Sequence, residues 1–419
     1  LHFLVVQGRL AMGEPMLPGI RLEVTLLSGR GVALTAAADR VTVGQLKRWA
    51  EKQLAVGIAQ LIYEDRILLD ANLLEKESLK DGDLLIANIR AAQILAGKTC
   101  PAFFLVRGDG RVAVWGDMSL GVPRHLRELQ QVVACKGAWA ALMDGQVVVW
   151  GHPRLIPEKV VLEELKDVRQ LCATEDALAA LRHDGRVITW GCSKSGGDSC
   201  AVEEQLDSIE LLAGSVGAFL AVSRDGRVIT WGSLRHGAVA GGWLPPLLAP
   251  PRQVAATRNA FAVLQEDGAV VWWGRGSSRV SRSLVVNEIM DLCSSEDTFV
   301  ALRKDGTVVT WQSASLMEME GLSQVKQVVA SRYAFAALKQ DGTVKVWGHL
   351  RYGGDPCSVR KLRQVQELYA SSAAFAALRA DGSVWTWGDA RYGGDGSPLA
   401  QQLSDVRRLC RFKRRFFET

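Results

Sequence analysis

The same seven-residue pattern occurs eight times in this chain: Asp-Gly, any residue, Val, two further residues and Trp. The Asp residues are Asp109, Asp144, Asp184, Asp225, Asp267, Asp305, Asp341 and Asp381, and the Trp residues are Trp115, Trp150, Trp190, Trp231, Trp273, Trp311, Trp347 and Trp387. Successive copies are 35 to 42 residues apart. Repetition at this period indicates one supersecondary unit whose copies cover one another's apolar faces.

Each repeat predicts a small antiparallel sheet. In the last copy, short apolar runs cover residues 365–370, 374–378 and 384–388, and Asp381-Gly382 separates the second run from the third. Asp-Gly between apolar runs is a strong hairpin signal, because Gly adopts positive φ without a Cβ clash. Gly recurs every few residues, which argues against helix. Sheets of three or four strands, repeated in this way, predict a β-propeller.

A large apolar residue precedes the Asp of each copy, at a fixed distance in all copies except the second. These residues are Phe103, Trp139, Leu178, Phe219, Phe261, Phe299, Phe335 and Phe375. Burying one such side chain contributes about 2–3 kcal/mol, so paired Phe and Trp residues are expected to form a packing layer between blades. A binding role is the weaker interpretation, because a binding surface does not need the same residue in every unit.

The motif Ala-Phe-Ala-Ala-Leu-x-x-Asp-Gly-x-Val-x-x-Trp-Gly, followed by a Gly-rich loop such as residues 391–395, resembles the repeat of the regulator of chromosome condensation superfamily. That superfamily includes β-lactamase-inhibitor protein II and the propellers of HECT-type ubiquitin ligases. The resemblance covers residues 91–419 and implies a β-propeller. Members usually have seven blades and the repeat count here is eight, so seven to eight blades are expected. Residues 406–409 form a partial ninth unit that either closes the ring or caps an open end.

Residues 19–90 lack the repeat, and residues 1–18, which include two prolines, are expected to be irregular. The pattern in between predicts strands within residues 20–34, a helix over 42–54 with Thr42 as N-cap, a short strand at 61–63 and a last strand at 84–90. This order and spacing resembles a ubiquitin-like β-grasp domain. The chain is therefore expected to be mainly β, with a small ubiquitin-like domain before the propeller.

The second resemblance implies an exposed apolar patch made by Leu27, Ile62 and Ile86, through which ubiquitin-like domains are recognised. Asn88 occupies one patch position, a departure that would weaken or redirect binding. Processing to a Gly-Gly tail is not expected, because Arg90 continues into the first repeat. The alternative is a small domain that only packs on the propeller.

The remaining composition argues against several kinds of chemistry. With 50 basic and 45 acidic residues the formal charge is +5, so nucleic acid is not expected as a partner, although residues 407–415 are locally basic. The Gly-rich loops lack the Lys-Ser and helix of a phosphate cradle. Cys135, Cys172, Cys293 and Cys410 are expected to be small buried residues with reduced thiols. No catalytic residue, cofactor, metal site or membrane segment is predicted.

These features favour a non-enzymatic scaffold: the propeller loops bind a protein partner, and the ubiquitin-like module recruits a second one, from the ubiquitin pathway. Arg351, Tyr352, Arg391 and Tyr392 are the expected contacts, since Tyr and Arg are enriched at hot spots; the alternative is that Arg-Tyr-Gly-Gly-Asp is a structural signature of the loop. Two other functions stay open. One is the substrate-recognition part of a ubiquitin ligase without its catalytic region, and the other is a guanine-nucleotide exchange or chromatin-associated factor. A cytoplasmic location is expected, with the nucleus as the alternative.

Overall fold

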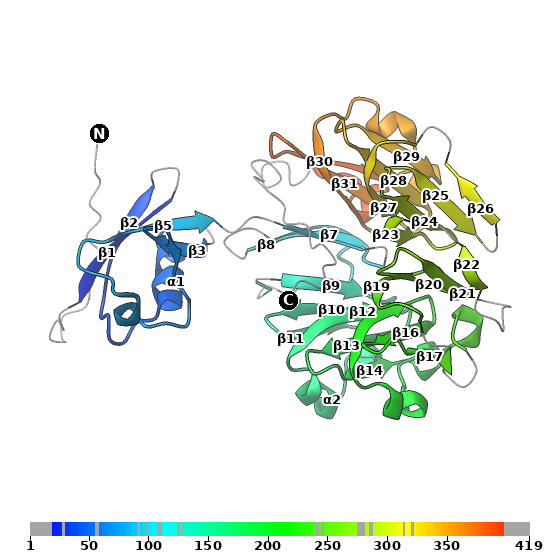
Figure 1. Ribbon diagram of the computed structural model, residues 1–419, viewed down its shortest axis with the longest axis horizontal. Coiled ribbons are helices and arrows are strands. Elements are labelled where there is room, and N and C mark those ends of the chain that lie inside the picture. The colour runs from blue at the N-terminus through cyan, green and yellow to red at the C-terminus, as the bar shows by residue number, and fades with distance from the viewer. Residues whose placement is uncertain are drawn as a thin grey trace. The chain divides into compact units, whose positions relative to one another are not determined.

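The chain divides into two compact units, residues 1–91 and 92–419, which are shown in Figure 1. The computed structural model describes residues 19–26, 30–54, 58–89, 93–97, 99–106, 111–123, 126–127, 129–239, 243–244, 247–274, 281–284, 288–312, 315–319 and 322–397. Most of the regular structure in these ranges is β-strand, as predicted.

The first unit is a five-stranded sheet with one α-helix. Its elements are β1 (Ile20–Leu26), β2 (Gly31–Ala36), α1 (Val43–Leu54), β3 (Ile58–Tyr63), β4 (Arg66–Ile67), the 3-10 helix η1 (Leu74–Glu77) and β5 (Leu84–Ile89). The strand order is β2-β1-β5-β3-β4, with β1 and β5 parallel and the other neighbours antiparallel. Thr42 caps the helix as predicted: its Oγ1 accepts the N–H of Gln45 at 3.2 Å, and the Gln45 side chain accepts the N–H of Thr42 at 2.9 Å.

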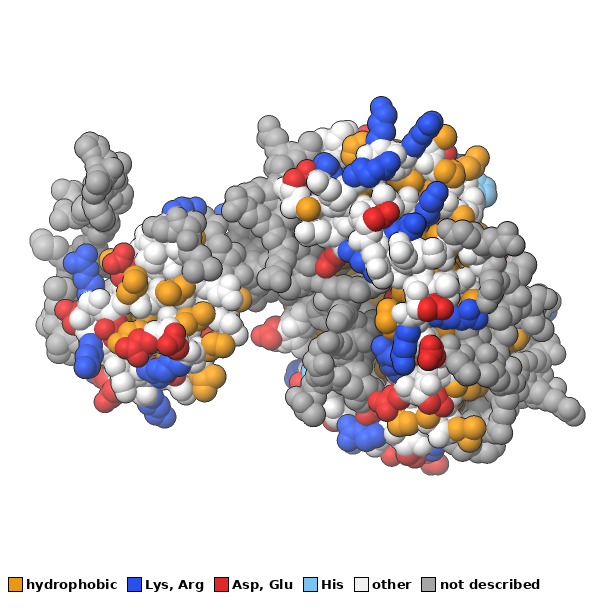
Figure 2. All heavy atoms as spheres, turned by 45° about the horizontal axis from the view of Figure 1, so that its top comes forward, with side chains coloured by type: hydrophobic (Ala, Val, Ile, Leu, Met, Phe, Trp, Pro, Cys, Tyr) orange, Lys and Arg blue, Asp and Glu red, His pale blue; other side chains and the backbone are white. Residues whose placement is uncertain are grey.

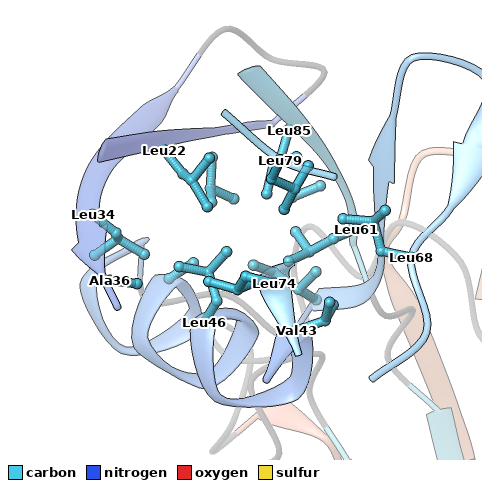
Figure 3. Packing of buried hydrophobic residues seen from close by; sticks show 14 of the residues in the cluster. Leu22, Leu34, Ala36, Val43, Leu46, Leu61, Leu68, Leu74, Leu79 and Leu85 are labelled. Carbon is cyan, nitrogen blue, oxygen red and sulfur yellow. The ribbon is translucent and has the colours of Figure 1, made fainter. Parts of the chain in front are cut away.

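Alternation along the strands decides which face of this sheet is covered. In β5, Leu85 is fully buried, while Leu84 and Ile86 on either side of it are exposed. Figure 3 shows Leu22 from β1 and Leu46 from α1 among the side chains that fill the space between the sheet and the helix. The helix covers one face of the sheet, and the exposed residues of β5 therefore belong to the other face.

The second unit contains eight antiparallel sheets in its described residues, and we number them as blades 1 to 8 in chain order. Blade 1 is β6 (Gln93–Leu95), β7 (Ala102–Val106) and β8 (Val112–Gly116), and blade 2 is β9 (Leu129–Ala134), β10 (Ala138–Met143) and β11 (Gln146–Gly151). Blade 3 is β12 (Val168–Ala173), β13 (Ala177–Arg182) and β14 (Val187–Gly191). Blade 4 is β15 (Ile209–Gly214), β16 (Ala218–Ser223), β17 (Val228–Gly232) and β18 (Trp243–Leu244). Blade 5 is β19 (Pro251–Ala256), β20 (Ala260–Gln265), β21 (Val270–Gly274) and β22 (Ser281–Leu284), and blade 6 is β23 (Ile289–Ser294), β24 (Phe299–Arg303), β25 (Val308–Gln312) and β26 (Ser315–Glu318). Blade 7 is β27 (Val325–Ala330), β28 (Ala334–Lys339) and β29 (Val344–Gly348). Blade 8 is β30 (Val365–Ala370), β31 (Ala374–Arg379) and β32 (Val384–Gly388).

The blades form a ring. First strands of consecutive blades contact one another, as β12 contacts β9 and β15, and Figure 1 shows the successive sheets of this unit in colours from cyan to red. Blade 8 packs against blade 1, because Ala376 and Leu378 share one buried cluster with Phe103 and Trp115. This cyclic order makes the unit a β-propeller. Short helices lie between the blades: α2 (Lys159–Glu164), and the 3-10 helices η2 (Pro153–Leu155), η3 (Ser193–Ser195), η4 (Cys200–Gln205), η5 (Leu234–His236), η6 (Leu350–Tyr352), η7 (Pro356–Val359) and η8 (Ala390–Tyr392).

The Asp-Gly pairs form the hairpins between the second and third strands, as predicted. The described turn glycines have φ between 74° and 86°, and they are Gly145, Gly185, Gly226, Gly268, Gly306, Gly342 and Gly382. At Asp305 the carboxylate accepts the N–H of Thr307 at 2.8 Å, and the carbonyl of Gly306 accepts the N–H of Val325 from the next blade at 3.0 Å. The carbonyls of Gly145, Gly185 and Gly342 accept an N–H from the following blade in the same way, so these turns also hold their neighbours. Asp109 lies outside the described residues.

The predicted aromatic layer is present. Ring centroids are 5.1–6.0 Å apart in Phe103–Trp115, Trp139–Trp150, Phe219–Trp231, Phe261–Trp273, Phe299–Trp311, Phe335–Trp347 and Phe375–Trp387. In blade 3, Leu178 lies opposite Trp190 instead. Each pair packs on the second strand of the preceding blade: Phe375 and Trp387, for example, share a cluster with Ala334, Ala336 and Leu338.

Backbone hydrogen bonds join the turns between the first and second strands. In these bonds the N–H of one blade donates to the carbonyl of the next, over 2.5–2.9 Å: Lys136 to Glu175, Glu175 to Val216, Arg258 to Glu296, Glu296 to Arg332, Arg332 to Ser372, and Ser372 to Cys100. The last bond joins blade 8 to blade 1. We call the eight equivalent residues the axial turn ring: Cys100, Lys136, Glu175, Val216, Arg258, Glu296, Arg332 and Ser372.

Glutamine side chains in the first strands add a second set of links that the sequence analysis missed. Gln327 donates to the carbonyl of Leu368 at 2.8 Å and accepts the N–H of Leu368 at 3.0 Å, so one amide satisfies two buried backbone groups of the next blade. Gln131 and Gln253 bond Leu171 and Leu292 in the same way.

The cysteines and the C-terminal segment were also the subject of predictions. Cys172 and Cys293, expected to be buried, are half-buried, because their positions in the first strands are only partly covered. Cys135, directly after β9, is half-buried as well, and Cys410 lies outside the described residues. The partial ninth unit at residues 406–409 and the basic segment at 407–415 lie outside the described residues.

We expect Gly306→Val to lower the free energy of unfolding by about 1–3 kcal/mol. At φ +80° a β-branched residue is strained, and its Cβ would lie 3.1 Å from the Cα of Gln324. Gly97→Val is the matched control, because Gly97 lies outside the positive-φ region and a Cβ there meets nothing within 4 Å. Chemical denaturation measures both variants, and equal effects at the two glycines would contradict this account of the turn.

Candidate functional site

One end of the propeller, which we call the loop face, carries both the axial turn ring and the loops that follow each Trp-Gly. The strands alternate in direction, so the third strand of a blade ends beside the start of the second, as Gly388 does beside Ala374. Backbone bonds fasten the loops to the turns: His349 N–H donates to the carbonyl of Tyr333 at 2.8 Å, and Asp389 N–H to that of Ala373 at 3.0 Å. The variable loops are thereby held rigidly near the axis.

The sequence-predicted residues of the propeller lie on two of these loops. Arg351 and Tyr352 belong to η6 in blade 7, and Arg391 and Tyr392 belong to η8 in blade 8. Both arginines are exposed and both tyrosines are half-buried. The backbone carbonyl of each tyrosine accepts a hydrogen bond from a serine hydroxyl in the turn between the first and second strands. Ser331 donates to Tyr352 at 3.0 Å, and Ser371 donates to Tyr392 at 2.8 Å.

The Gly-Gly pair of Arg-Tyr-Gly-Gly-Asp has a structural role. Gly353 has φ +95°, and a Cβ there would lie 2.5 Å from the ring of Phe375 in the next blade. Its carbonyl accepts the indole N–H of Trp387 at 3.1 Å. Gly393 meets Phe103 and Trp115 of blade 1 in the same manner. The glycines thus fit the loop to the neighbouring blade, whereas the arginines before them point to solvent.

Asp389 holds Arg351 and Arg391 together. Arg391 donates from Nε to Oδ1 at 3.2 Å and from Nη2 to Oδ2 at 2.9 Å, while Arg351 Nε donates to Oδ2 at 3.0 Å. The Asp389 side chain is only 10% exposed, and the two arginine side chains are 63% and 65% exposed. These hydrogen bonds, chiefly those from Arg391, lower the pKa of Asp389 to about 2.

A second carboxylate flanked by two arginines lies on the axial turn ring, and the sequence analysis missed it. Glu296, 13% exposed, is 3.4 Å from Arg258 Nε and 3.7 Å from Arg332 Nε, and the two arginine side chains are 42% and 38% exposed. The three residues come from blades 6, 5 and 7. Only their repeat-equivalent position, three residues before Phe261, Phe299 and Phe335, could have indicated that they meet.

Tyrosines connect the two groups. Arg258 Nη2 donates to the Tyr333 hydroxyl at 2.5 Å, and the ring of Tyr333 lies edge-on to that of Tyr352, with centroids 4.8 Å apart. Tyr352 in turn lies edge-on to His349 at 5.2 Å. The arginine groups therefore belong to one continuous cluster across blades 5 to 8.

A cavity of about 180 Å³ opens at the axis beside this cluster. Its walls include Glu296 and Arg332, the ion-paired Lys136 and Glu175, and Tyr392. Basic and acidic groups both line it, so its walls carry no single charge. It is large enough for a side chain of a partner and makes the centre of the loop face concave.

The first unit carries a separate apolar surface on its uncovered sheet face. Ile62 of β3 pairs directly with Ile86 of β5 and with Ile67 of β4, so the two described residues of the predicted patch do meet. Ile86, Ile67 and Leu84 are exposed and Ile62 is half-buried. We call these four residues the sheet patch. Figure 2 shows hydrophobic side chains among charged ones on the visible face of this unit.

Four residues differ between the sheet patch and the patch that the sequence predicted. Ile67 and Leu84 were missed from the sequence, although the alternation of Leu84, Leu85 and Ile86 indicated an outward Leu84. Asn88 is exposed at the next outward position of β5, opposite Gln60. Leu27 lies outside the described residues.

In the described parts of the chain, no group of three or more His, Cys, Asp and Glu side chains is arranged to hold a metal ion. Within the same ranges, no helix has both the length and the apolar character needed to cross a membrane.

The ring of repeated sheets places the second unit in the class of β-propellers. No family model matches the chain, and no curated protein matches it. Among solved structures it is similar to the ectodomain of the receptor kinase CR4 from Physcomitrella patens (16% identity, 62% of this chain and 74% of that one, TM-score 0.45). It is also similar to Prp20p from Saccharomyces cerevisiae (15%, 72% and 82%, TM-score 0.41) and to yeast RCC1 (Prp20) in its complex with Kap60 (18%, 65% and 77%, TM-score 0.41). These similarities are too distant to bear on function, and the fold rests on the sheets and contacts described above.

We expect Asp389→Asn to destabilise the protein at neutral pH and to remove one acid transition. The pKa of Asp389 falls from an ordinary 3.8 to about 2 on folding, so its contribution to stability is complete above pH 3.8 and is lost as the pH falls through about 2. After allowance for solvent screening, the difference from wild type should be about 1 kcal/mol at pH 6 and should shrink between pH 4 and pH 2.

Asp355→Asn is the matched control for this measurement. Asp355 caps η7 by accepting the N–H of Cys357 and forms no ion pair among the described residues. Urea unfolding at a series of pH values measures both variants. A difference between wild type and Asp389→Asn that does not change with pH would contradict the assignment.

Proposed function

We propose that this protein is a non-enzymatic interaction scaffold with two docking surfaces. The loop face of the propeller binds a protein partner, and the sheet patch of the first unit recruits a second partner, from the ubiquitin pathway. The observation that carries the first half is the continuous cluster of arginine and tyrosine side chains across blades 5 to 8. Tyr and Arg dominate binding hot spots when they are held in place around a concave centre.

Preorganisation supports this interpretation. Arg351 and Arg391 are fixed by one shared carboxylate, and their loops are fixed by Gly353 and Gly393 against the next blade. Ordering a free arginine at an interface costs about 0.5–1.5 kcal/mol, and side chains that are already held avoid part of that cost. If these arginines were only solvated surface groups, the loop face would not need to hold them in fixed positions.

For the first unit we propose a ubiquitin-like domain over residues 19–90, followed by the propeller over residues 91–419. The order β2-β1-β5-β3-β4 with parallel β1 and β5, and a helix on one face, supports the proposal. A cluster of exposed aliphatic side chains can be desolvated in one event, which suits a docking surface. Substrate recognition for a ubiquitin ligase would use the same two surfaces and would differ only in the enzyme that is recruited.

We expect Leu350→Ala to weaken capture of the propeller partner by about 1–2 kcal/mol without lowering the melting temperature. Leu350 is an exposed apolar residue of η6, directly before Arg351. Leu234, exposed at the equivalent position of η5 in blade 4, provides the matched control Leu234→Ala. Affinity purification of the full chain identifies the partner by mass spectrometry, and titration then compares the variants. Equal binding by wild type and Leu350→Ala would count against docking at blades 7 and 8.

We expect Ile86→Ala to weaken a ubiquitin-pathway partner by about 1–3 kcal/mol and to leave the melting temperature nearly unchanged. Ile86 is exposed at the centre of the sheet patch, opposite Ile62. Thr35→Ala, on the exposed side of β2, is the control at the far edge of the same sheet. Calorimetric scans beside binding titrations separate the outcomes. Lower stability with unchanged binding would mean that the residue only packs.

A further inference from the structure

The two arginine pairs of the loop face share one construction. In each, two arginines from different blades or loops flank one carboxylate, and the carboxylate is nearly covered while the guanidinium groups reach solvent. Asp389 lies beneath Arg351 and Arg391, and Glu296 lies beneath Arg258 and Arg332. The four guanidinium groups are therefore more accessible to an approaching molecule than the two carboxylates that they flank.

Charge does not cancel within these pairs. Two guanidinium groups and one carboxylate leave one positive charge per pair, and the guanidinium has five N–H donors in a fixed planar fork. The contacts to Asp389 use Nε of Arg351 and Nε and Nη2 of Arg391, so donors on both side chains remain for a ligand. Carboxylate is a natural complement for such donors, because the fork matches its two oxygens.

Other charged groups near the loop face limit what can bind there. Glu175 and Asp117 line the axial cavity, and Asp355 and Asp395 lie in the loops that follow η6 and η8. Asp297, exposed directly after Glu296, offsets part of the charge of Arg258. A nucleic-acid strand carries its phosphates in a continuous row and would pass from the arginines onto these acids. A short acidic peptide can place its charges at the arginine pairs alone.

The aromatic side chains favour the same choice. Tyr333 and Tyr352 lie edge-on to each other, and His349 lies edge-on to Tyr352, so the rings pack on one another. Proteins that bind single strands instead present aromatic faces on which bases stack. Here the rings pack on one another, and the Tyr333 hydroxyl accepts a hydrogen bond from Arg258.

We propose that the loop face recognises an acidic polypeptide segment, whose carboxylates bind the Arg258–Arg332 and Arg351–Arg391 pairs. This proposal rests on the proposed function of the loop face and names the chemistry of its partner. The segment lies across blades 5 to 8, beside the axial cavity.

The test uses a fluorescein-labelled ten-residue peptide, in which a Glu-Glu pair at each end is separated by six Gly and Ser residues, and the full-length chain, with binding followed by fluorescence anisotropy. We expect saturable binding that weakens about tenfold between 50 and 300 mM NaCl, since screened charge pairs carry it. Arg258→Gln/Arg332→Gln and Arg351→Gln/Arg391→Gln should each weaken binding at least fivefold. Arg351→Lys/Arg391→Lys keeps the charge without the fork and should fall between wild type and the Gln variant.

Lys304→Gln/Lys361→Gln is the matched control, because it removes two exposed charges at the opposite, Asp-Gly end of the propeller and should leave binding unchanged. Neither lysine forms an ion pair among the described residues. Melting temperatures identify any variant that fails to fold, and the salt dependence of the wild type then stands as the independent measurement.

Three results would overturn the proposal: no binding of the peptide, binding that the control weakens as much as the arginine variants, or equally tight binding of a ten-nucleotide oligothymidine. The outcomes also separate it from the proposed function. Loss of partner capture in Leu350→Ala, together with unchanged capture in both Arg-to-Gln variants, would keep the docking face and reject the acidic partner. If the peptide binds through the arginines but Leu350→Ala does not change capture of the partner, docking of that partner at the loop face is rejected.

Discussion

The propeller depends on the packing of a Phe–Trp pair against the small-residue strand of the preceding blade. Ala374 and Ala376 are fully buried, and because they are small, the aromatic rings of the next blade can approach their sheet closely. The loop glycine then covers the rings, and in blades 1, 2, 4 and 8 a loop carbonyl accepts the indole N–H. Since the contact recurs around the ring and joins blade 8 to blade 1, no blade can shift without disturbing its neighbours.

Rigidity at these repeated positions leaves other positions free to vary. The axial turn ring shows this clearly, because the backbone N–H and carbonyl groups that join its blades are present whatever the side chain. The same position can therefore hold Cys, Lys, Glu, Val, Arg or Ser without loss of the ring. Arg258, Glu296 and Arg332 occupy three such positions, and their chemistry is available for recognition because the fold does not use it.

The first unit achieves an exposed surface by a different route. Its single helix covers one face of a five-stranded sheet, and strand alternation then places Leu84 and Ile86 on the other face. The register of β3 against β5 brings Ile62 opposite Ile86. Apolar side chains that remain exposed after the core is complete are what a docking surface requires, and a one-residue shift in register would have buried them.

The sequence by itself determined the local structure: the Asp-Gly hairpins, the Phe–Trp layer and the capped helix at Thr42 follow from short-range chemistry that every copy or segment carries. It also indicated Arg351, Tyr352, Arg391 and Tyr392, and the pairing of Ile62 with Ile86. Only the tertiary structure decided that Asp389 binds Arg351 as well as Arg391, that Glu296 lies between Arg258 and Arg332, and that Gln327 links two blades. These partners are separated by 36 to 41 residues, and no local pattern relates them. They meet because the ring brings equivalent positions of successive blades together around one axis.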